Sequence, residues 1–537
     1  MANSLDYTVD MMYEESEPES TPIKDYFRGK TVLLTGGTGF LGLLYVEKLL
    51  RVGVRSLYLV IRNKKGKSPQ ERVQELYSGR LFNRVAKLDA NYLQRIKLVE
   101  GDMNQEQFGI SNEDLVDIYK NVQMVIHAAA DVRFDQALPN LILTNVRGTK
   151  EILKISENIE NLEVFAYIST AYSHAPRCNI DEKFYEPAID PNVIIHIVEN
   201  QGESDDFIIL QDRISHPWPN NYVYSKSLSE ELVRRWKWHI PVCVIRPTIV
   251  ISTHEDPLPG WGGNLYGLNG VSISVGSGAM RLLHINKRLV GDIICADYVI
   301  NSTLVAMWAT YEDFAVDMEL GKPVVQRDPE VFHVSSCLDS PVTWDEVRYH
   351  LVKAFADYPS KQMIWKHSLT MTACPIMFRI YVLYYHVIPA YIFDIFLRFT
   401  DTNLRMVPMT RKAHRFLVAI SYFMQREWKF TNHNMRRVLT RMTKSDQDYF
   451  PSDIRRWKWS DFVYDYMHGL KYTVLSETPN SAAEGRKKYR KLLALHVIVL
   501  IFFYGIHAYL LYTILKFYGF FNYVENQAIH ILDFMTN

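Results

Sequence analysis

One segment near the start of the chain restricts its fold more than any other. The run Thr31–Thr35 is apolar and β-branched, and it leads directly into a glycine-rich loop that opens a helical pattern ending at Arg51. Glycines at this spacing allow a tight turn, a close approach of the backbone to a pyrophosphate, and close packing of helix on strand. Because the loop lies between a strand and a helix, it predicts a dinucleotide site. The predicted contacts are Thr35, Gly36, Gly37, Thr38, Gly39, Phe40, Leu41 and Gly42.

Short apolar runs alternate with longer helical patterns through residues 29–340. This order predicts an α/β fold with a Rossmann-type, doubly wound parallel sheet covered by helices on both faces. Residues 176–220 interrupt the alternation, and this insertion either covers a substrate site or forms a surface loop. The candidate strands are residues 31–35, 57–61, 96–99, 124–127, 164–169, 242–246 and 331–334.

The end of the second candidate strand indicates which dinucleotide binds. Arg62 stands where an NAD-selective fold places an acid on the ribose hydroxyls, and Lys64 and Lys65 follow it. These cations would pair with a 2′-phosphate, so we expect NADPH, although a solvated charge cluster on a loop is the alternative. Further along, we expect Asp102 to accept from the adenine amine. Small side chains let the cofactor lie against the backbone at Ala128, Ala129 and Ala130, and Pro247 ends the sixth candidate strand beside them.

A tyrosine and a lysine one helical turn apart suggest the chemistry. A tyrosine is a weak proton donor at neutral pH unless a nearby cation stabilises its phenolate. Tyr222 and Lys226 have the i, i+4 spacing that places both on one helix face, and both would also contact the cofactor. The same spacing recurs elsewhere, but only this pair lies between the fifth and sixth candidate strands. The other pairs are Tyr26/Lys30, Tyr349/Lys353 and Tyr512/Lys516.

Three further polar residues complete the predicted catalytic set. Ser169 and Thr170 follow the fifth candidate strand, at the carboxyl edge where open α/β sheets bind ligands. One of these hydroxyls would bind the substrate oxygen. Asn145, on the helix after the fourth strand, would hold the backbone and a water that relays protons to Lys226, unless it is merely a polar residue on the helix surface.

The C-terminal part of the chain has a different pattern. Residues 341–475 are helical and aromatic, and residues 476–491 read as a linker and a basic flank. Residues 492–515 contain no Asp, Glu, Lys or Arg, and these 24 residues are long enough as a helix to cross a hydrocarbon core of ~30 Å. They predict a transmembrane helix, with an amphipathic or buried helix as the alternative, followed by a tail over residues 516–537. The cations before the run place the large N-terminal part in the cytosol.

A weaker apolar stretch covers residues 376–399. Arg379, Asp394 and Arg398 interrupt it, and a charge at the centre of a bilayer costs ~2.5 kcal/mol or more. A membrane-spanning helix is therefore disfavoured here. An interfacial helix or a wall along the acyl-chain path is an alternative, but a core helix is the preferred interpretation.

The rest of the chain excludes several classes of protein. Residues 1–28 read as a disordered acidic tail without the features of a secretory or transit peptide. Sixty basic residues balance sixty acidic ones, so the broad positive field of a nucleic-acid-binding protein is absent. Five dispersed cysteines indicate reduced thiols and no metal site.

These motifs resemble a known family. The glycine motif, Arg62, Ser169-Thr-Ala-Tyr172 and Tyr222-Val-Tyr-Ser-Lys226 are similar to those of the extended short-chain dehydrogenases/reductases. The narrower resemblance is to the eukaryotic fatty acyl-CoA reductases, insect-like in character, and it covers about residues 29–469 and the anchor. By motif position, the hydroxyl partner maps to Thr170 better than to Ser169. The narrower match rests on the motifs beginning at Asp131, Arg246, Pro257 and Val331.

The resemblance implies NADPH-dependent reduction of a long-chain fatty acyl-CoA to a fatty alcohol by two hydride transfers through an aldehyde, with release of CoA. It also implies that the helical region is the family's "sterile" domain and that the enzyme faces the cytosol from a membrane. The endoplasmic reticulum is the first expectation and the peroxisome the second. Two alternatives remain: a membrane-bound reductase of sterols or other lipophilic ketones and alcohols, and a non-catalytic NADP-binding interaction protein.

Overall fold

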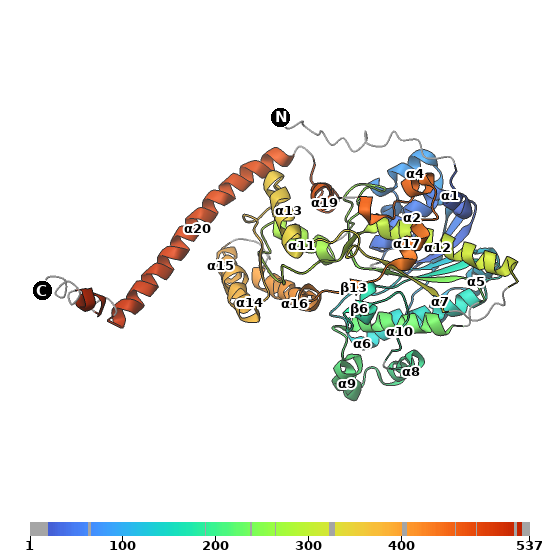
Figure 1. The fold of residues 1–537 in the computed structure, drawn as a ribbon, viewed down its shortest axis with the longest axis horizontal. Coiled ribbons are helices and arrows are strands. Elements are labelled where there is room, and N and C mark those ends of the chain that lie inside the picture. Colours follow the sequence, from blue (N-terminus) through green and yellow to red (C-terminus); the bar gives the residue numbers. More distant parts are fainter. Residues whose placement is uncertain are drawn as a thin grey trace.

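A seven-stranded parallel sheet forms the centre of the molecule (Figure 1). The computed structural model describes residues 20–528 except 63–65, 188, 237–238, 264, 322–327, 400–404, 457, 479–480 and 520–522. The strand order is β11-β7-β5-β4-β1-β2-β3. Strands β2 and β3 are added on one side of β1, and the strands from β4 onward are added on its other side, so the switch point lies between β1 and β4. This order confirms the predicted doubly wound fold. All seven expected strands are present: β1 (Thr31–Thr35), β2 (Ser56–Ile61), β3 (Ile96–Glu100), β4 (Met124–His127), β5 (Val164–Ile168), β7 (Val242–Pro247) and β11 (Glu330–Val334).

Helices cover both faces of this sheet because both faces carry apolar side chains. Along β1, Val32 and Leu34 pack into one core, and Leu33 between them packs into the other. This alternation is the period of two that a pleated strand imposes. Helices α2 (Phe40–Val52) and α12 (Ala296–Glu319) cover the first face, and α5 (Asn112–Asn121), α7 (Gly148–Glu157) and α10 (Asn221–Arg235) cover the second (Figure 1).

Shorter elements connect and flank this core. They are α1 (Pro22–Phe27), α3 (Pro69–Tyr77), η2 (Arg80–Phe82), α4 (Asn83–Leu88), η3 (Tyr92–Arg95), η4 (Glu106–Gly109), α6 (Leu138–Leu141), the π-helical η5 (Ile142–Arg147), η6 (Ala171–His174), β8 (Ile249–Ile251), α11 (Gly267–Gly276), β9 (Leu282–His284) and β10 (Ile293–Cys295). The insertion after β5 is mostly ordered structure and not a bare loop, since it contains β6 (Asn179–Ile180), α8 (Pro191–Gln201) and α9 (Asp205–Ser215), with Ile194 and Phe207 buried.

The C-terminal region is helical, as predicted, but it shares its packing with the sheet region. Strand β12 pairs with β9, and β13 pairs with β6, so strands of this region add to strands that precede it. Side chains of α13 and α19 belong to the same apolar core as those of α2 and α12. The elements are α13 (Trp344–Asp357), β12 (Thr370–Thr372), α14 (Pro375–Val382), the π-helical η7 (Leu383–Val387), α15 (Ile388–Leu397), α16 (Met406–Met424), β13 (Lys429–Phe430), α17 (His433–Leu439), α18 (Lys444–Tyr449), η8 (Ile454–Arg456), α19 (Trp459–Thr473) and α20 (Ala482–Phe517).

The structure corrects the expected disordered tail at residues 20–28. Residues 22–27 form α1, which Thr21 caps and Pro22 opens. Ile23 and Phe27 are one turn apart and fully buried, so apolar packing fixes this helix. The Ile23 amide also donates to Asp446 Oδ1, at 3.1 Å. Residues 1–19 of the expected tail lie outside the described residues.

The expected linker and basic flank are also ordered in their described residues, 476–478 and 481–491. Glu477 is buried and accepts a hydrogen bond from Ser360 Oγ, which ties this stretch to the region after α13. Helix α20 begins at Ala482, so the basic flank and the apolar run 492–515 form one continuous helix. The flank is rich in Ala, Lys and Arg, which favour helix. The tail that was expected after residue 515 starts inside α20, and its residues 520–522 and 529–537 lie outside the described part.

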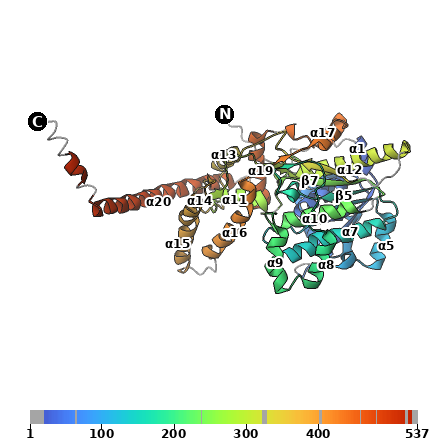
Figure 2. The ribbon, with the colours of Figure 1, turned by 60° about the horizontal axis from the view of Figure 1, so that its bottom comes forward.

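The preferred interpretation of residues 376–399 as a core helix is wrong. Helices α14 and α15, joined by η7, bury only Phe378 and Ala390. The span Pro375–Leu397 and helix α20 are the two described helices that are long and apolar enough to cross a membrane, and their apolar windows are 11% and 0% buried. The pattern misled because apolar residues lie on every side of the helix, which a core and a bilayer favour equally. Figure 2 shows both segments projecting from the body of the molecule.

Candidate functional site

The carboxyl ends of the central strands bring the predicted site residues to one edge of the sheet. Thr35 of β1 lies opposite His127 of β4, and His127 lies opposite Tyr167 of β5. Thr35 Oγ1 and His127 Nδ1 are 2.7 Å apart, so the first and fourth strands are cross-linked just below the glycine loop. The loop after β1, the alanines after β4 and the hydroxyls after β5 therefore lie at one edge of the sheet. The switch point of a doubly wound sheet is where a ligand-binding crevice is expected.

The glycine loop fits a dinucleotide because side chains there would collide with backbone. A Cβ on Gly36 would lie 2.8 Å from Ala129 Cα, and the φ of +78° favours glycine. A Cβ on Gly42 would lie 2.0 Å from the Gly36 carbonyl oxygen. Gly39 is the N-cap of α2, so the first amides of this helix face the crevice without a side-chain cap. Free amides at a helix N-terminus are suited to bind a pyrophosphate.

Two arginines lie beside this loop, and the sequence pattern revealed only one of them. Arg62 follows β2 with an exposed side chain, and Lys64 and Lys65 lie outside the described residues. Arg72 on α3 donates to the Arg62 carbonyl oxygen at 2.6 Å and to Thr38 Oγ1 at 3.2 Å. Its guanidinium thus bridges the end of β2 and the glycine loop. One carboxylate oxygen of Asp102 already takes part in a local turn, since Oδ1 accepts a hydrogen bond from the Asn104 amide at 3.0 Å.

Tyr222 and Lys226 lie on α10, on the face that meets the ends of β4 and β5. Lys226 is 2% exposed, its Nζ donates to the Ile168 carbonyl oxygen at 2.7 Å, and it lies 4.4 Å from the centroid of the Tyr167 ring. Burial lowers the pKa of Lys226 to about 7, and the nearby Glu230 carboxylate partly offsets that effect. Burial raises the pKa of Tyr222 above its usual range. A proton leaves such a tyrosine readily only when a cation stabilises the phenolate.

The two adjacent hydroxyls after β5 have different environments. Ser169 Oγ donates to Glu230, away from the crevice, so Ser169 is part of the support of the site. Thr170 caps η6, and its Oγ1 accepts from the Tyr172 amide at 3.3 Å. The Thr170 hydroxyl hydrogen is therefore available for another acceptor, whereas the hydrogen of Ser169 is used. This difference favours Thr170 as the hydroxyl that binds a substrate oxygen.

Glu230, which the sequence pattern did not reveal, organises a buried charge cluster one turn after Lys226. Its carboxylate accepts from Arg246 Nη2 at 2.7 Å, His174 Nε2 at 3.0 Å and Ser173 Oγ at 3.0 Å. Burial alone would raise the pKa of Glu230, but the Arg246 guanidinium and His174 outweigh burial and hold the pKa well below its usual range. Glu230 is therefore a permanent anion one helical turn after Lys226.

Asn145 lies in the π-helical turn η5 and is 2% exposed, so the alternative of a residue on the helix surface is wrong. Its Nδ2 donates to the Asp131 carbonyl oxygen at 3.0 Å and to Ser225 Oγ at 2.9 Å, and its Oδ1 accepts from the Asp131 amide at 2.8 Å. The side chain therefore joins the segment after β4 to α10. Single π-helical turns often mark functional sites. The proton relay remains a prediction.

Comparison with known proteins agrees with this geometry. Residues 34–303 and 385–477 match two regions of the family described as "Male sterility protein", the first of them an NAD-binding region. The chain is 32% identical to fatty acyl-CoA reductase 1 of Homo sapiens over 476 residues, which cover 88% of this chain and 89% of the relative. It is also 32% identical to the fatty acyl-CoA reductase wat of Drosophila melanogaster over 499 residues, covering 93% and 94%. The chain belongs to the fatty acyl-CoA reductase family.

Solved structures with the same fold support the architecture of this family member. The reductase domain of a nonribosomal peptide synthetase from Mycobacterium tuberculosis has a TM-score of 0.54 at 19% identity, covering 84% of this chain and 93% of that one. The terminal R domain from the myxalamid pathway has a TM-score of 0.52 at 18% identity, covering 83% and 91%. The NAD-binding region also shows that this reductase uses a nicotinamide cofactor.

An aromatic wall beside Tyr222 adds residues that sequence reasoning did not place in the acyl-CoA reductase site. The rings of Tyr222 and Phe134 stack with centroids 5.8 Å apart, and Phe134 lies 5.7 Å from Phe423 of α16. Tyr172, two residues after Thr170, meets Phe423 edge to face at 5.2 Å. The C-terminal region therefore contributes directly to the surroundings of Tyr222. Phe134 belongs to the motif that begins at Asp131, so the sequence could have pointed to it. Only the fold shows that Phe423 lies beside Phe134.

Proposed function

We propose that this chain reduces long-chain fatty acyl-CoA to fatty alcohol with NADPH and releases CoA. The observation that carries the proposal is the placement of Tyr222 and Lys226 on α10, beside the glycine loop and Thr170, at the carboxyl edge of one sheet. The curated relatives are named fatty acyl-CoA reductases, which favours this activity over a sterol reductase and over a non-catalytic binding protein. The apolar and aromatic surroundings of Tyr222 suit a lipid substrate.

The side chains would act in sequence on the thioester carbonyl. The hydroxyls of Thr170 and Tyr222 bind its oxygen, and Tyr222 donates a proton to that oxygen as negative charge develops there. The Lys226 cation stabilises the resulting phenolate. When bound, NADPH supplies the hydride to the carbonyl carbon. The hemithioacetal would then lose its hydroxyl proton to the sulfur as the carbon–sulfur bond breaks, which gives aldehyde and the CoA thiol. The same residues would serve the reduction of the aldehyde to alcohol, for which a second NADPH would supply the hydride.

NADPH is proposed over NADH because two arginines lie where the adenosine ribose belongs. Arg62 ends β2 with an exposed side chain, and Arg72 is held against the glycine loop through Thr38. An arginine pairs well with a phosphate through two parallel N–H donors. We also propose that Asp102 accepts a hydrogen bond from the adenine amine. The residues proposed to lie along the cofactor are Ala128, Ala129, Ala130 and Pro247. All of them end or follow strands of the central sheet at its carboxyl edge, where the glycine loop also lies.

We also propose that α20 anchors the enzyme in a membrane. Its apolar part is unburied and carries no charged residue from 492 to 515, and exposed cations precede it. The cations are Arg486, Lys487, Lys488, Arg490 and Lys491. The positive-inside tendency puts the reductase in the cytosol. We propose the endoplasmic reticulum first and the peroxisome second; protease protection of the reductase part in sealed microsomes would contradict the cytosolic orientation.

One experiment tests reaction, cofactor and proton donor together. Detergent-solubilised protein is supplied with acyl-CoAs of different lengths and either NADPH or NADH, and the products are identified. We expect fatty alcohol from the parent with NADPH. Tyr222→Phe should lower kcat by about 10²–10⁴-fold, the usual contribution of a positioned proton donor. Arg62→Gln should raise the KM for NADPH and leave the KM for NADH unchanged.

The controls separate a wrong substrate from a damaged protein. Tyr224→Phe changes a neighbouring tyrosine of the same helix and should leave turnover near the parent value. If NADPH binds and no acyl-CoA is consumed, the proposed substrate is wrong, and sterols or ketones are tested next. If Tyr222→Phe is as active as the parent, Tyr222 is not the proton donor.

A further inference from the structure

The segment from α14 to α16 presents an apolar surface that the described part of the chain leaves uncovered. Fourteen consecutive residues, 380–393, contain no Asp, Glu, Lys or Arg. Large apolar side chains are exposed along its length, with Ile376 at 69%, Phe396 at 66% and Phe399 at 84%. The others on α14, η7 and α15 are Met377, Ile380, Leu383, Tyr384, Ile388, Tyr391, Ile392, Phe393 and Ile395. Soluble monomers rarely expose a contiguous apolar surface of this extent.

Side-chain and backbone contacts hold this surface against the rest of the protein. Phe378 stacks on His284 of β9 with ring centroids 4.7 Å apart, and Arg281 Nη2 donates to the Tyr385 carbonyl oxygen at 2.7 Å. At the far end of α15, Asp394 accepts from the first amides of α16, at 2.5 Å from Met406 N and 3.1 Å from Val407 N. Asp394, one of the charges that argued against a membrane-spanning helix, is therefore used as a helix cap.

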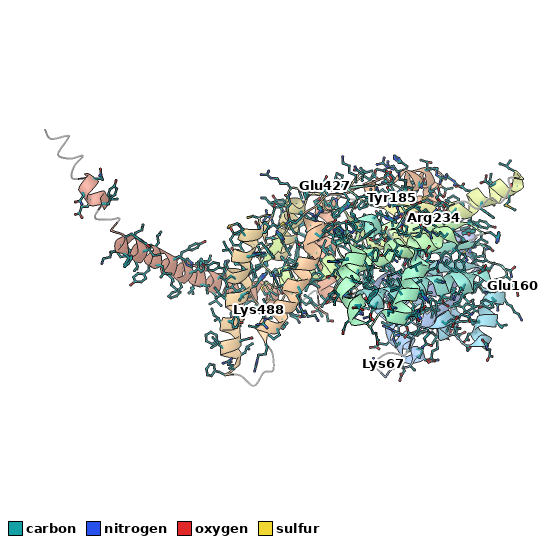
Figure 3. All side chains as sticks on the ribbon, turned by 90° about the horizontal axis from the view of Figure 1, so that it is seen from below. Lys67, Glu160, Tyr185, Arg234, Glu427 and Lys488 are labelled. Carbon is teal, nitrogen blue, oxygen red and sulfur yellow. The ribbon has the colours of Figure 1, made fainter. Side chains whose placement is uncertain are left out.

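The surface contacts the proposed anchor at a defined position along helix α20. Tyr384 of η7 lies 5.7 Å from the Phe503 ring and 5.9 Å from the His507 ring of α20. Phe503 is about 17 Å along the helix from residue 492, where the apolar run starts, at 1.5 Å per residue. Nearer the basic flank, Lys488 Nζ donates to the Lys361 carbonyl oxygen at 2.9 Å (Lys488 is labelled in Figure 3). A bilayer that surrounds the apolar part of α20 must therefore also meet η7.

The chemistry of the two helices fits a lipid surface. The span Pro375–Leu397 has the length to cross a membrane. Its charge-free part, residues 380–393, is only about 21 Å long at 1.5 Å per residue, which is shorter than a hydrocarbon core of about 30 Å. Helix α16 carries exposed Arg411, Lys412 and Arg415 and no acid within its bounds. An apolar face beside a basic one is the pattern of a helix that lies in the interface and binds anionic headgroups.

We propose that α14, η7, α15 and α16 form a second membrane-embedded element, a hairpin that enters the leaflet nearest the reductase and does not cross it. Residues 376–399 insert among acyl chains, and the cations of α16 pair with lipid phosphates. The proposal rests on the proposed anchoring by α20. The reductase is then held against the bilayer at two places, with α16 extending from the membrane to Phe423 in the aromatic wall beside Tyr222.

Depth-dependent quenching in the full-length chain tests this proposal. In a Cys178→Ser, Cys337→Ser, Cys374→Ser background, a polarity-sensitive fluorophore is attached through Phe396→Cys, Ile501→Cys or Tyr349→Cys. Position 501 reports on α20, and position 349, 57% exposed on α13, reports on the body. Each labelled protein that retains NADPH oxidation is reconstituted in phosphatidylcholine vesicles with or without phosphatidylserine. Bromines on the acyl chains quench from within the bilayer, and iodide quenches from water.

We expect the labels at 396 and 501 to be quenched by brominated lipid and shielded from iodide, and the label at 349 to behave in the opposite way. Charge reversal at Arg411, Lys412 and Arg415 should weaken bromine quenching at 396 only in vesicles with phosphatidylserine. If 501 is quenched by bromine and 396 by iodide, the hairpin is wrong and the anchor stands. If neither is quenched by bromine, both fail. Shielding of 396 from both quenchers, with disulfide cross-linking between copies, would show that a second copy covers the surface.

Discussion

Lys226 and Glu230 are one turn apart on α10, and the charge of each affects the other. Burial brings the pKa of Lys226 to about 7, so the cation that we propose stabilises the Tyr222 phenolate is lost as the pH rises above that value. The Glu230 carboxylate favours the protonated lysine and raises its pKa. We infer that Glu230 is a positioning residue that keeps Lys226 charged near neutral pH.

This coupling predicts a shift in the pH profile. For the parent, kcat/KM for acyl-CoA at saturating NADPH should fall on the alkaline side as Lys226 loses its proton. Glu230→Gln removes the anion that raises the lysine pKa, so the alkaline fall should move to lower pH. Lys226→Arg should lower activity but abolish the alkaline fall, because arginine remains protonated.

A purely structural role for Glu230 gives a different result. Glu230→Gln leaves the fully buried Arg246 without its carboxylate, and breaking such a buried pair costs about 3–5 kcal/mol of folding free energy. Denaturation of Glu230→Gln and of Glu230→Asp measures that loss directly. An unshifted pH profile in a folded but destabilised Glu230→Gln protein would refute the effect on Lys226.

At the scale of elements, the glycine loop depends on contacts between backbone atoms. Gly42 lies one turn into α2, and a methyl group there would meet the Gly36 carbonyl oxygen at 2.0 Å. Relief of that clash requires movement of α2 or of the loop, and both present amides to the crevice. The cost of such overpacking is about 1–3 kcal/mol.

Gly42→Ala should therefore raise the Kd for NADPH by about tenfold or more, since about 1.4 kcal/mol corresponds to tenfold. Gly79→Ala is the matched control, because the nearest atom to its added Cβ is 3.8 Å away. Titration of NADPH fluorescence gives both constants. Equal affinity in the Gly42→Ala and Gly79→Ala proteins would mean that the loop adapts without loss.

The sequence predicted the elements whose patterns are local. The seven sheet strands appeared because each is a short apolar run, and the Tyr222/Lys226 pair appeared because its spacing is one helical turn. Residues 376–399 were misassigned because apolar composition alone does not distinguish a protein core from a lipid contact. Helix α1 was missed because so short a helix depends mainly on the tertiary contacts of Ile23 and Phe27, and its Thr21 cap and Pro22 alone are a weak signal. Glu230 and Arg72 were missed because their partners lie far away along the chain.

At the scale of the whole molecule, the N-terminal helix α1 packs against the C-terminal helical region. Helix α1 contributes Ile23 and Phe27 to the core, and its Ile23 amide reaches Asp446 of α18. A second set of contacts joins α2 to Asp256, which precedes a cis bond to Pro257. The Asp256 carboxylate accepts hydrogen bonds from Lys48 Nζ at 3.0 Å and from Arg51 Nη2 at 2.5 Å. Removal of a buried apolar side chain leaves a cavity.

Ile23→Ala should lower the free energy of unfolding by about 2–5 kcal/mol, although Ile23 is not among the proposed catalytic residues. Arg28→Ala, at an exposed position next to the same helix, should change it by less than about 0.5 kcal/mol. Urea denaturation of the detergent-solubilised proteins, followed by tryptophan fluorescence, compares the two. If both variants are equally stable, α1 does not contribute to the folded core.

The pairing of β13 with β6, and of β12 with β9, has a consequence for how the chain acquires its structure. Each pair joins segments that are distant in sequence, and contacts of this kind form late and slow the folding of a domain. The central sheet can assemble first, but β6 keeps an unpaired edge until Lys429 and Phe430 reach it. A fragment that ends near residue 340 would retain that open edge and an uncovered apolar face, which favours aggregation over native assembly. We therefore expect the dinucleotide half and the helical half to fold as one cooperative unit, although they can be distinguished by sequence.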